Sequence, residues 1–333
     1  MLSPLPLIVT PGDPAGIGAE ITVKSWHAGY RDICMIDSPD RIANIADKLC
    51  TPLTIKTINH PRDFKAGQDV FHIIPIDWPV SPVAGSPDSR NGQVVVNAIT
   101  TAVQLCRANA AAGIVTNPIQ KSTLYEAGFS YPGHTEFLAR FGDVDSGGPM
   151  MMLACEDLKV VPLTVHLPIT EVASNLSKEA IIAAVHLLDA NLKKFFSIAT
   201  PNIAVTGLNP HAGENGTIGR EDYDIIQPAI NCLKNSGIHV SGPHSADTLF
   251  HAEARKTYDV VLGMYHDQVL IPIKTLDFFG GVNITLGLDF IRTSPDHGTG
   301  MNIAGSGLAR PDSFIAAIKM ASKMATADGI FSR

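Results

Sequence analysis

The sequence has no long hydrophobic run. No stretch approaches the roughly 18 uninterrupted apolar residues that a membrane-spanning helix requires. The amino-terminal segment has no basic residues ahead of its apolar run, and prolines interrupt that run, so it does not have the form of a signal peptide. We therefore expect a cytoplasmic protein that does not act on membranes.

Cysteine is scarce, and the cationic residues are not clustered. The 5 cysteines lie far apart and form no C-x-x-C pair, which excludes a disulfide framework or a zinc knuckle and predicts reduced thiols. The net charge is -7, with Lys and Arg scattered along the chain. This distribution argues against a groove that binds nucleic acid.

The rest of the composition is that of a globular enzyme. Of the 333 residues, 45% are hydrophobic and 17% are charged, which is too apolar for a disordered chain. Because domains average roughly 150 residues, this length predicts two lobes.

Short apolar runs alternate with longer helical patterns along the chain. Residues 94–108 and 178–196 have apolar residues at helical spacing, and Ser177 is a candidate N-cap for the second segment. This alternation predicts an α/β fold with a largely parallel sheet that helices cover on both faces. The expected strands are 5–10, 32–37, 111–116, 159–165, 201–207 and 258–264.

Three histidines follow predicted strands. His166, His211 and His266 each lie at or just beyond the carboxyl end of a strand, which is the edge where open α/β sheets bind ligands. Three imidazoles there would form a catalytic divalent-metal site with open coordination positions; the alternative is solvated loop histidines. Asp247 and Asp267 would orient the imidazoles, although Asp247 could instead cap a helix.

Other polar residues lie in glycine-rich turns. Residues 12–20 have the order G-x-x-x-G-x-G, which differs from dinucleotide and P-loop motifs; a tight strand-to-helix turn explains it equally well. His134 and Thr135 stand at a predicted helix start, which favours an anion, unless Thr135 is only an N-cap. Lys121 follows another strand, where a lysine is usually solvated.

The carboxyl-terminal part has cationic and amide side chains among glycines and apolar residues. Lys274, Asn283 and Arg292 stand within a short segment of this kind. Such a set suggests recognition of a phosphate or carboxylate, against the alternative of charges that simply reach the surface. We expect an anionic ligand.

These motifs together resemble a known family. The blocks "TPGDPAGIG", "YPGHTEFLA", "VVPLTVHLPI", "GLNPHAGENGTIG", "MYHDQ" and "GVNITLGLDFIRTSPDHGTG" occur in order, and they resemble the 4-hydroxythreonine-4-phosphate dehydrogenases of pyridoxal phosphate biosynthesis. The resemblance implies an isocitrate/isopropylmalate dehydrogenase-like fold, with two α/β/α lobes, a central cleft and a homodimer whose active sites draw on both chains. The expected lobes are 1–125 plus 290–333, and 126–289, the latter with the metal-binding and dimer-interface elements.

The resemblance also implies the site. It makes His166, His211 and His266 the metal ligands, shared across the dimer, and the glycines around His211 would leave room for substrate and cofactor. The cofactor would be NAD or NADP, bound by residues not assigned, and the ion zinc, cobalt, magnesium or manganese, with three imidazoles favouring zinc or cobalt. The implied substrate contacts are His134, Thr135, Lys274, Asn283 and Arg292.

The implied reaction is oxidation of 4-phosphooxy-L-threonine at its 3-hydroxyl, followed by loss of carbon dioxide to give 3-amino-2-oxopropyl phosphate. Lys121, Asp247 and Asp267 are candidate proton acceptors. One alternative is a paralogous dehydrogenase of 4-phospho-D-threonate or 4-phospho-D-erythronate. More distant alternatives are a cis-dihydrodiol dehydrogenase and a regulatory protein that binds metal or phosphate without catalysis.

Two positions depart from the family pattern. Ala19 stands where the family has proline, and Asn117 stands where a glycine is usual. We expect Ala19 only to loosen a helix start. We expect Asn117 to lie close to the cleft, where it would bear on the identity of the substrate.

Overall fold

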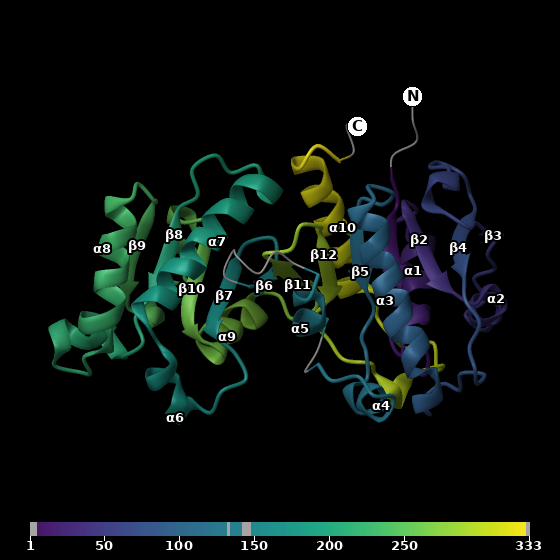
Figure 1. Ribbon diagram of the computed structural model, residues 1–333, viewed down its shortest axis with the longest axis horizontal. Helices are drawn as coiled ribbons and strands as arrows, with labels where there is room; N and C mark the ends of the chain where they lie inside the picture. Colours follow the sequence, from purple (N-terminus) through teal and green to yellow (C-terminus); the bar gives the residue numbers. More distant parts are fainter. Residues whose placement is uncertain (1–4, 132–133, 142–147, 331–333) are drawn as a thin grey trace. The chain divides into compact units, whose positions relative to one another are not determined.

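The computed structural model of the protein describes residues 5–131, 134–141 and 148–330, except for the side chains of 134–136. The chain divides into two compact units, Met1–Phe141 with Leu288–Arg333, and Gly142–Gly287. Each unit contains a sheet with helices packed on it (Figure 1). The predicted α/β class is confirmed.

The first unit has an entirely parallel sheet. Adjacent strands pair in register, with Ile8 opposite both Cys34 and Ile114. In spatial order the strands are β3 (Ile55–Thr57), β4 (Phe71–Pro75), β2 (Ile33–Asp37), β1 (Leu7–Thr10), β5 (Gly113–Thr116) and β12 (Arg292–Pro295). Strands β1, β2 and β5 are buried on both faces, as expected for a parallel sheet under helices, whereas the edge strand β3 is mostly exposed.

Helix α3 (Gly92–Arg107) packs on β1 and β5, and α10 (Asp312–Ala327) packs on β5 and β12. Alternate strand residues such as Ile8 and Ile114 face α3, because strand side chains alternate between the two faces. The remaining helices of this unit are α1 (Gly18–His27), α2 (Pro39–Lys48), α4 (Lys121–Glu126) and α5 (His134–Ala139).

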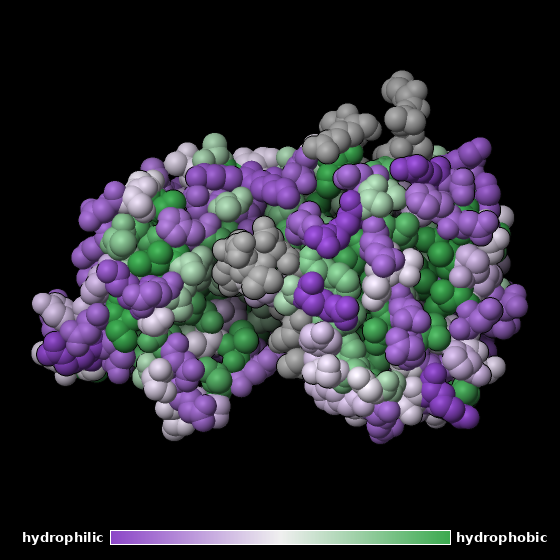
Figure 2. All heavy atoms as spheres, viewed as in Figure 1, coloured by the Kyte–Doolittle hydropathy of each residue, from purple (hydrophilic) through white to green (hydrophobic). Residues whose placement is uncertain are grey.

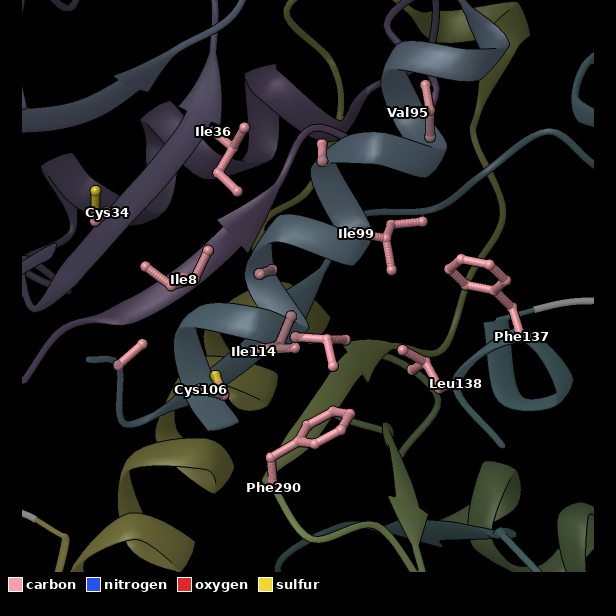
Figure 3. Packing of buried hydrophobic residues seen from close by; sticks show 14 of the residues in the cluster. Ile8, Cys34, Ile36, Val95, Ile99, Cys106, Ile114, Phe137, Leu138 and Phe290 are labelled. Atoms are coloured by element: carbon pink, nitrogen blue, oxygen red, sulfur yellow. The ribbon is translucent and has the colours of Figure 1, made fainter. Parts of the chain in front are cut away.

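Figure 3 shows the core beneath α3. Val95 and Ile99 of α3 meet the strand residues, and Phe137 and Leu138 of α5 point toward the same cluster. Helix α5 therefore belongs to the first unit, whereas the sequence-based division assigned 126–289 to the second lobe.

The second unit has a mixed sheet. Strand β6 runs antiparallel to β11 and β7, and the other neighbours are parallel. The order is β11 (Val282–Leu286), β6 (Met150–Ala154), β7 (Lys159–Thr164), β10 (Val260–Tyr265), β8 (Ile203–Thr206) and β9 (Val240–His244).

Helix α7 (Lys178–Phe196) has the bounds that its apolar spacing predicts. The Ser177 hydroxyl accepts a hydrogen bond from the Ala180 N–H at 3.1 Å, so the predicted N-cap is confirmed. The other helices of this unit are α6 (Ile169–Val172), α8 (Gln227–Asn235) and α9 (His266–Leu276).

Hydrophilic residues cover most of the face drawn in Figure 2, and hydrophobic residues show between them. Among the helices within the described ranges, none is both long enough and apolar enough to cross a membrane.

Asn117 holds the turn that leads from β1 into α1. Its side chain is fully buried, and its amide donates to the Thr10 carbonyl and to the Thr22 hydroxyl, each at 3.0 Å. Asn117 therefore has a structural role within the first unit, where its buried side chain fixes a strand-to-helix turn, and its expected position close to the cleft stays a prediction.

Replacing Asn117 should destabilise the first unit. Asn117→Ala removes two buried hydrogen bonds, and we expect the free energy of unfolding to fall by about 1–3 kcal/mol. The matched control is Asn97→Ala on the exposed face of α3, which should change it by less than about 0.5 kcal/mol. Urea unfolding of the two variants measures the difference, and equal losses would contradict the structural role of Asn117.

Stability should also depend on the protonation of His72. The ring is 1% exposed and packs 4.7 Å from the ring of Phe64; burial, and secondarily the charge of Lys56, lower the pKa of His72. At His72 the unfolded chain therefore binds a proton more readily than the folded protein does. The stability contributed by neutral, buried His72 is fully present above pH 6.5 and is lost as the pH falls below that value.

We expect the free energy of unfolding to decline between pH 7 and 5 by up to about 1.4 kcal/mol per pH unit from this group. The measurement is urea unfolding across that range for the wild type and for His72→Leu. The variant should lose part of the pH dependence, and identical pH dependence in the two proteins would contradict the account.

Candidate functional site

The three candidate metal ligands follow three neighbouring parallel strands of the second unit. Strands β7, β10 and β8 lie side by side in that order. His166 follows β7, His266 begins α9 directly after β10, and His211 lies in the turn η5 (Pro210–Gly216) after β8. Parallel pairing therefore brings all three segments to the same edge of one sheet.

His166 and His266 come together at this edge. Their ring centroids are 6.1 Å apart, and both line a cavity of about 350 Å³ together with Thr164 and Tyr265. The Nδ1 atom of His266 is 2.7 Å from an Asp267 carboxylate oxygen. With the proton on Nδ1 in this bond, Nε2 carries the lone pair that a metal ion requires.

Side-chain hydrogen bonds connect the three strand ends. The Thr164 hydroxyl of β7 donates to the Met264 carbonyl of β10 at 2.7 Å. The Gln268 side-chain oxygen accepts from the Met264 N–H at 2.7 Å and from the Thr206 hydroxyl at 2.8 Å, while its amide donates to the Gly207 carbonyl at 2.7 Å. Sequence reasoning did not single out Gln268, although it directly follows Asp267.

The turn that carries His211 has an unusual backbone. From His211 to Asn215 every residue has positive φ, between 42° and 74°, and each non-glycine residue in a left-handed turn costs roughly 1–2 kcal/mol. His211 is exposed. The Ser245 hydroxyl, and to a lesser degree the charge of His211, lower the pKa of Asp247, so His211 and Asp247 lie near each other.

Two glycines around His211 make room for side chains of the protein itself. A Cβ at Gly207 would lie 2.5 Å from a carboxylate oxygen of Asp222, and one at Gly219 would lie 2.5 Å from the Asn209 amide nitrogen. The expectation that the glycines leave room for substrate and cofactor is therefore wrong at these two positions.

One chain presents the candidate ligands in two separate groups. Among the described residues, no three His, Cys, Asp or Glu side chains come together in a metal-binding arrangement. Imidazole nitrogens suit a divalent transition ion, so the pair formed by His166 and His266 fits such an ion chemically. A catalytic ion with three protein ligands would need one ligand more than this pair offers.

The candidate substrate contacts are spread over both units. Lys274 is half-buried on α9, with its Nζ 5.6 Å from the Phe278 ring centroid, and Asn283 lies on β11. Arg292 begins β12 in the first unit and is 3% exposed. Its Nε and Nη2 donate to the Thr116 hydroxyl at 3.2 and 2.7 Å.

His134 and Thr135 begin α5, but their side chains lie outside the described part of the protein. Lys121 is exposed at the first position of α4. These residues therefore belong to the first unit, on α4 and α5.

The glycine-rich turn after β1 is closed by its own hydrogen bonds. The N–H of Asp13 donates to Pro118, that of Ala15 to the Asp13 carboxylate, and that of Ile17 to Thr299, each at 2.9 Å. These amides are already used within the chain, so the turn holds two segments together and does not offer them to a phosphate.

A second cavity, of about 720 Å³, lies in the first unit beyond β1, β2 and β4. Its lining includes the cations Arg41 and Lys48, the ring of Trp78, and the acidic residues Glu20, Asp40 and Asp77. The buried carboxylate of Asp37 accepts hydrogen bonds from Arg41 at 2.5 Å and from the Trp78 ring nitrogen at 3.0 Å. Burial raises the pKa of Asp37, and Arg41 opposes that shift.

Sequence reasoning missed this cavity. The signal was the carboxylate of Asp37 at the end of the predicted strand 32–37, but nothing in the pattern showed that Arg41 and Trp78 would converge on it. The cavity combines charges of both signs, an aromatic ring and polar groups.

Known proteins resemble the chain over nearly its whole length. It is 48% identical to a 4-hydroxythreonine-4-phosphate dehydrogenase of Caulobacter vibrioides, covering 98% of this chain and 99% of that protein. The crystal structure of the Klebsiella pneumoniae protein with the same name matches with a TM-score of 0.87 at 36% identity, covering 96% and 99% of the two chains.

A more distant structure is a terephthalate 1,2-cis-dihydrodiol dehydrogenase from Burkholderia xenovorans LB400, with a TM-score of 0.66, 26% identity, and coverage of 96% and 98%. The protein-family model described as pyridoxal phosphate biosynthetic protein PdxA matches residues 30–321 of this chain. The chain therefore belongs to the PdxA family of pyridoxal phosphate biosynthetic proteins.

Proposed function

We propose that the protein oxidises and decarboxylates 4-phosphooxy-L-threonine to 3-amino-2-oxopropyl phosphate, with NAD or NADP and a divalent metal ion. The observation that carries this proposal is the pairing of His166 with His266 beside a cavity at the carboxyl ends of β7 and β10. The identity of 48% to a protein named for this activity supports it.

We assign the metal to His166 and His266 together with His211 of the partner subunit. A homodimer would supply the third imidazole that one chain does not bring to the pair. Large apolar side chains are exposed in the second unit on α9 and the segment after it, Ile271, Phe278 and Phe279, and a second copy would cover them.

The cavity beside Arg41, Lys48 and Trp78 is our candidate for the nicotinamide cofactor. Cationic groups can hold its phosphates, and an aromatic ring can stack on a base. When bound, the metal ion lowers the pKa of the substrate hydroxyl and the nicotinamide accepts a hydride.

The chain's own residues would bind and orient the substrate. Lys274, Asn283 and Arg292, with His134 and Thr135, are proposed to hold the phosphate and carboxylate. Oxidation places a ketone β to the carboxylate, so carbon dioxide can leave as the carbon–carbon bond breaks.

Lys121, Asp247 and Asp267 are the candidate acceptors of the hydroxyl proton. A lowered pKa makes a carboxylate a weaker base, which argues against Asp247. Asp267 already has one oxygen engaged by His266. Lys121, at the start of α4, is the remaining candidate, since neither the lowered pKa of Asp247 nor the hydrogen bond of Asp267 applies to it.

The proposed reaction predicts metal-dependent formation of NADH from 4-phosphooxy-L-threonine. After treatment with EDTA we expect activity to fall at least about a hundredfold, because the metal supplies several kcal/mol of charge stabilisation. Added zinc or cobalt should restore it, with release of one carbon dioxide per NADH.

The same assay with 4-phospho-D-threonate separates the paralogous activity. Preference for the D-acid would keep the metal chemistry and overturn the substrate assignment. Turnover of a cis-dihydrodiol would instead match the Burkholderia xenovorans relative. Full activity after complete metal removal would overturn the metal assignment.

A second prediction concerns His266, whose side chain is 39% exposed. His266→Ala should reduce kcat/KM by at least about a hundredfold and weaken cobalt binding, while the melting temperature changes little, because the ring contributes to the site more than to the core. The matched control is His186→Ala on the exposed face of α7. Equal activity in the two variants would contradict the assignment of His266.

A further inference from the structure

We infer that Asp222 is a positioning residue that holds the His211 turn in its left-handed conformation. This inference extends the proposed metal site and rests on it. Asp222 is buried at the start of η6 (Asp222–Ile226), the segment that follows the His211 turn in the sequence. Its carboxylate lies beside Gly207, the residue that directly follows β8, and it has no assigned role in the reaction.

The Asp222 carboxylate accepts hydrogen bonds from the residues that precede the turn. One carboxylate oxygen accepts from the Leu208 N–H at 2.8 Å. The other accepts from the Asn209 N–H at 3.1 Å and from the Asn209 side-chain amide at 2.8 Å. Both oxygens thus act only as acceptors, which a carboxylate can do and a carboxamide cannot.

The backbone after these contacts is unfavourable without support. His211 and Ala212 have φ of 53° and 51°, a region that side-chain-bearing residues rarely adopt. Such a conformation persists only where the surroundings over-determine it. The buried carboxylate supplies that constraint at the residues immediately before the turn.

The glycines near the turn match this arrangement. Gly207 lies so close to Asp222 that a Cβ would approach its oxygen to 2.5 Å, and at Gly213 the approach would be 3.1 Å. Glycine at positions 207 and 213 therefore allows the Asp222 carboxylate to pack against the turn. Gln268 fixes the entrance from the other side through the Gly207 carbonyl.

Asp222→Asn is the informative substitution because it preserves volume. In either orientation of the new amide, its NH₂ group faces the Leu208 N–H or the two Asn209 donors. An NH₂ group cannot accept a hydrogen bond, so at least one of these bonds is lost. The matched control is Asp224→Asn: Asp224 is exposed in the same helical segment and pairs with Arg220 at 2.8 Å.

The first measurement is hydrogen–deuterium exchange of the full-length protein without metal. In Asp222→Asn we expect amides of 207–216 to exchange at least about tenfold faster, with the rest of the protein unchanged, whereas Asp224→Asn should match the wild type. Unchanged exchange in 207–216 would overturn the inference.

The second measurement is cobalt affinity by absorption spectroscopy. Asp222→Asn should raise the Kd about ten- to a hundredfold, as is usual when a residue behind a metal ligand is changed. In a His211→Ala background the same substitution should have no further effect, because Asp222 acts through His211. An equal effect in both backgrounds would show a general structural role and overturn the inference.

The outcomes separate this inference from the proposed function. If wild-type protein binds no cobalt, the metal assignment fails, and hydrogen exchange alone still decides whether Asp222 holds the turn. If Asp222→Asn does not fold, Asn209→Ala removes a single donor to the same carboxylate and should give a smaller increase in exchange. No increase in that variant would likewise count against the inference.

Discussion

Parallel pairing of β7, β10 and β8 is the constraint on which the rest of the site depends. It brings three chain segments, distant in sequence, to one edge of the sheet, where Thr164 and Gln268 connect the strand ends by hydrogen bonds. His166 and His266 meet because their strands are neighbours. His211 follows the third strand, but its position depends on a strained turn that needs support from Asp222 and Gln268.

The fold could be predicted where burial follows a simple period. The apolar runs predicted as strands at 5–10, 111–116, 159–165 and 258–264 correspond to β1, β5, β7 and β10. Helix α7 begins and ends where its apolar spacing predicts. Two of the strands that were not predicted have weak sequence signals. Strand β9 contains Gly242 and Pro243, and β12 has the polar sequence RTSP although it is fully buried. Their pairing is set by tertiary contacts, which local propensity does not encode.

The site could be predicted only in part, for the same physical reason. Strand-end position correctly predicted that all three histidines follow strands at one edge of the sheet, because the chain's direction fixes the carboxyl edge of a parallel sheet; their role as metal ligands stays a prediction. Asp222 and Gln268 were out of reach, since their roles arise from contacts with loops that no periodicity describes. The structural role of Asn117 was also out of reach, because the family pattern showed a departure at this position but not its partners, the Thr10 carbonyl and the Thr22 hydroxyl.

The central claim is that one metal ion joins His166 and His266 to His211 of the partner subunit. The most direct measurement is an anomalous difference map from crystals grown with cobalt or zinc. The account predicts one strong peak per chain, about 2.0–2.1 Å from a nitrogen of each of these three rings. A peak bound elsewhere, or a peak with His166 and His266 but no third imidazole from a second chain, would contradict it.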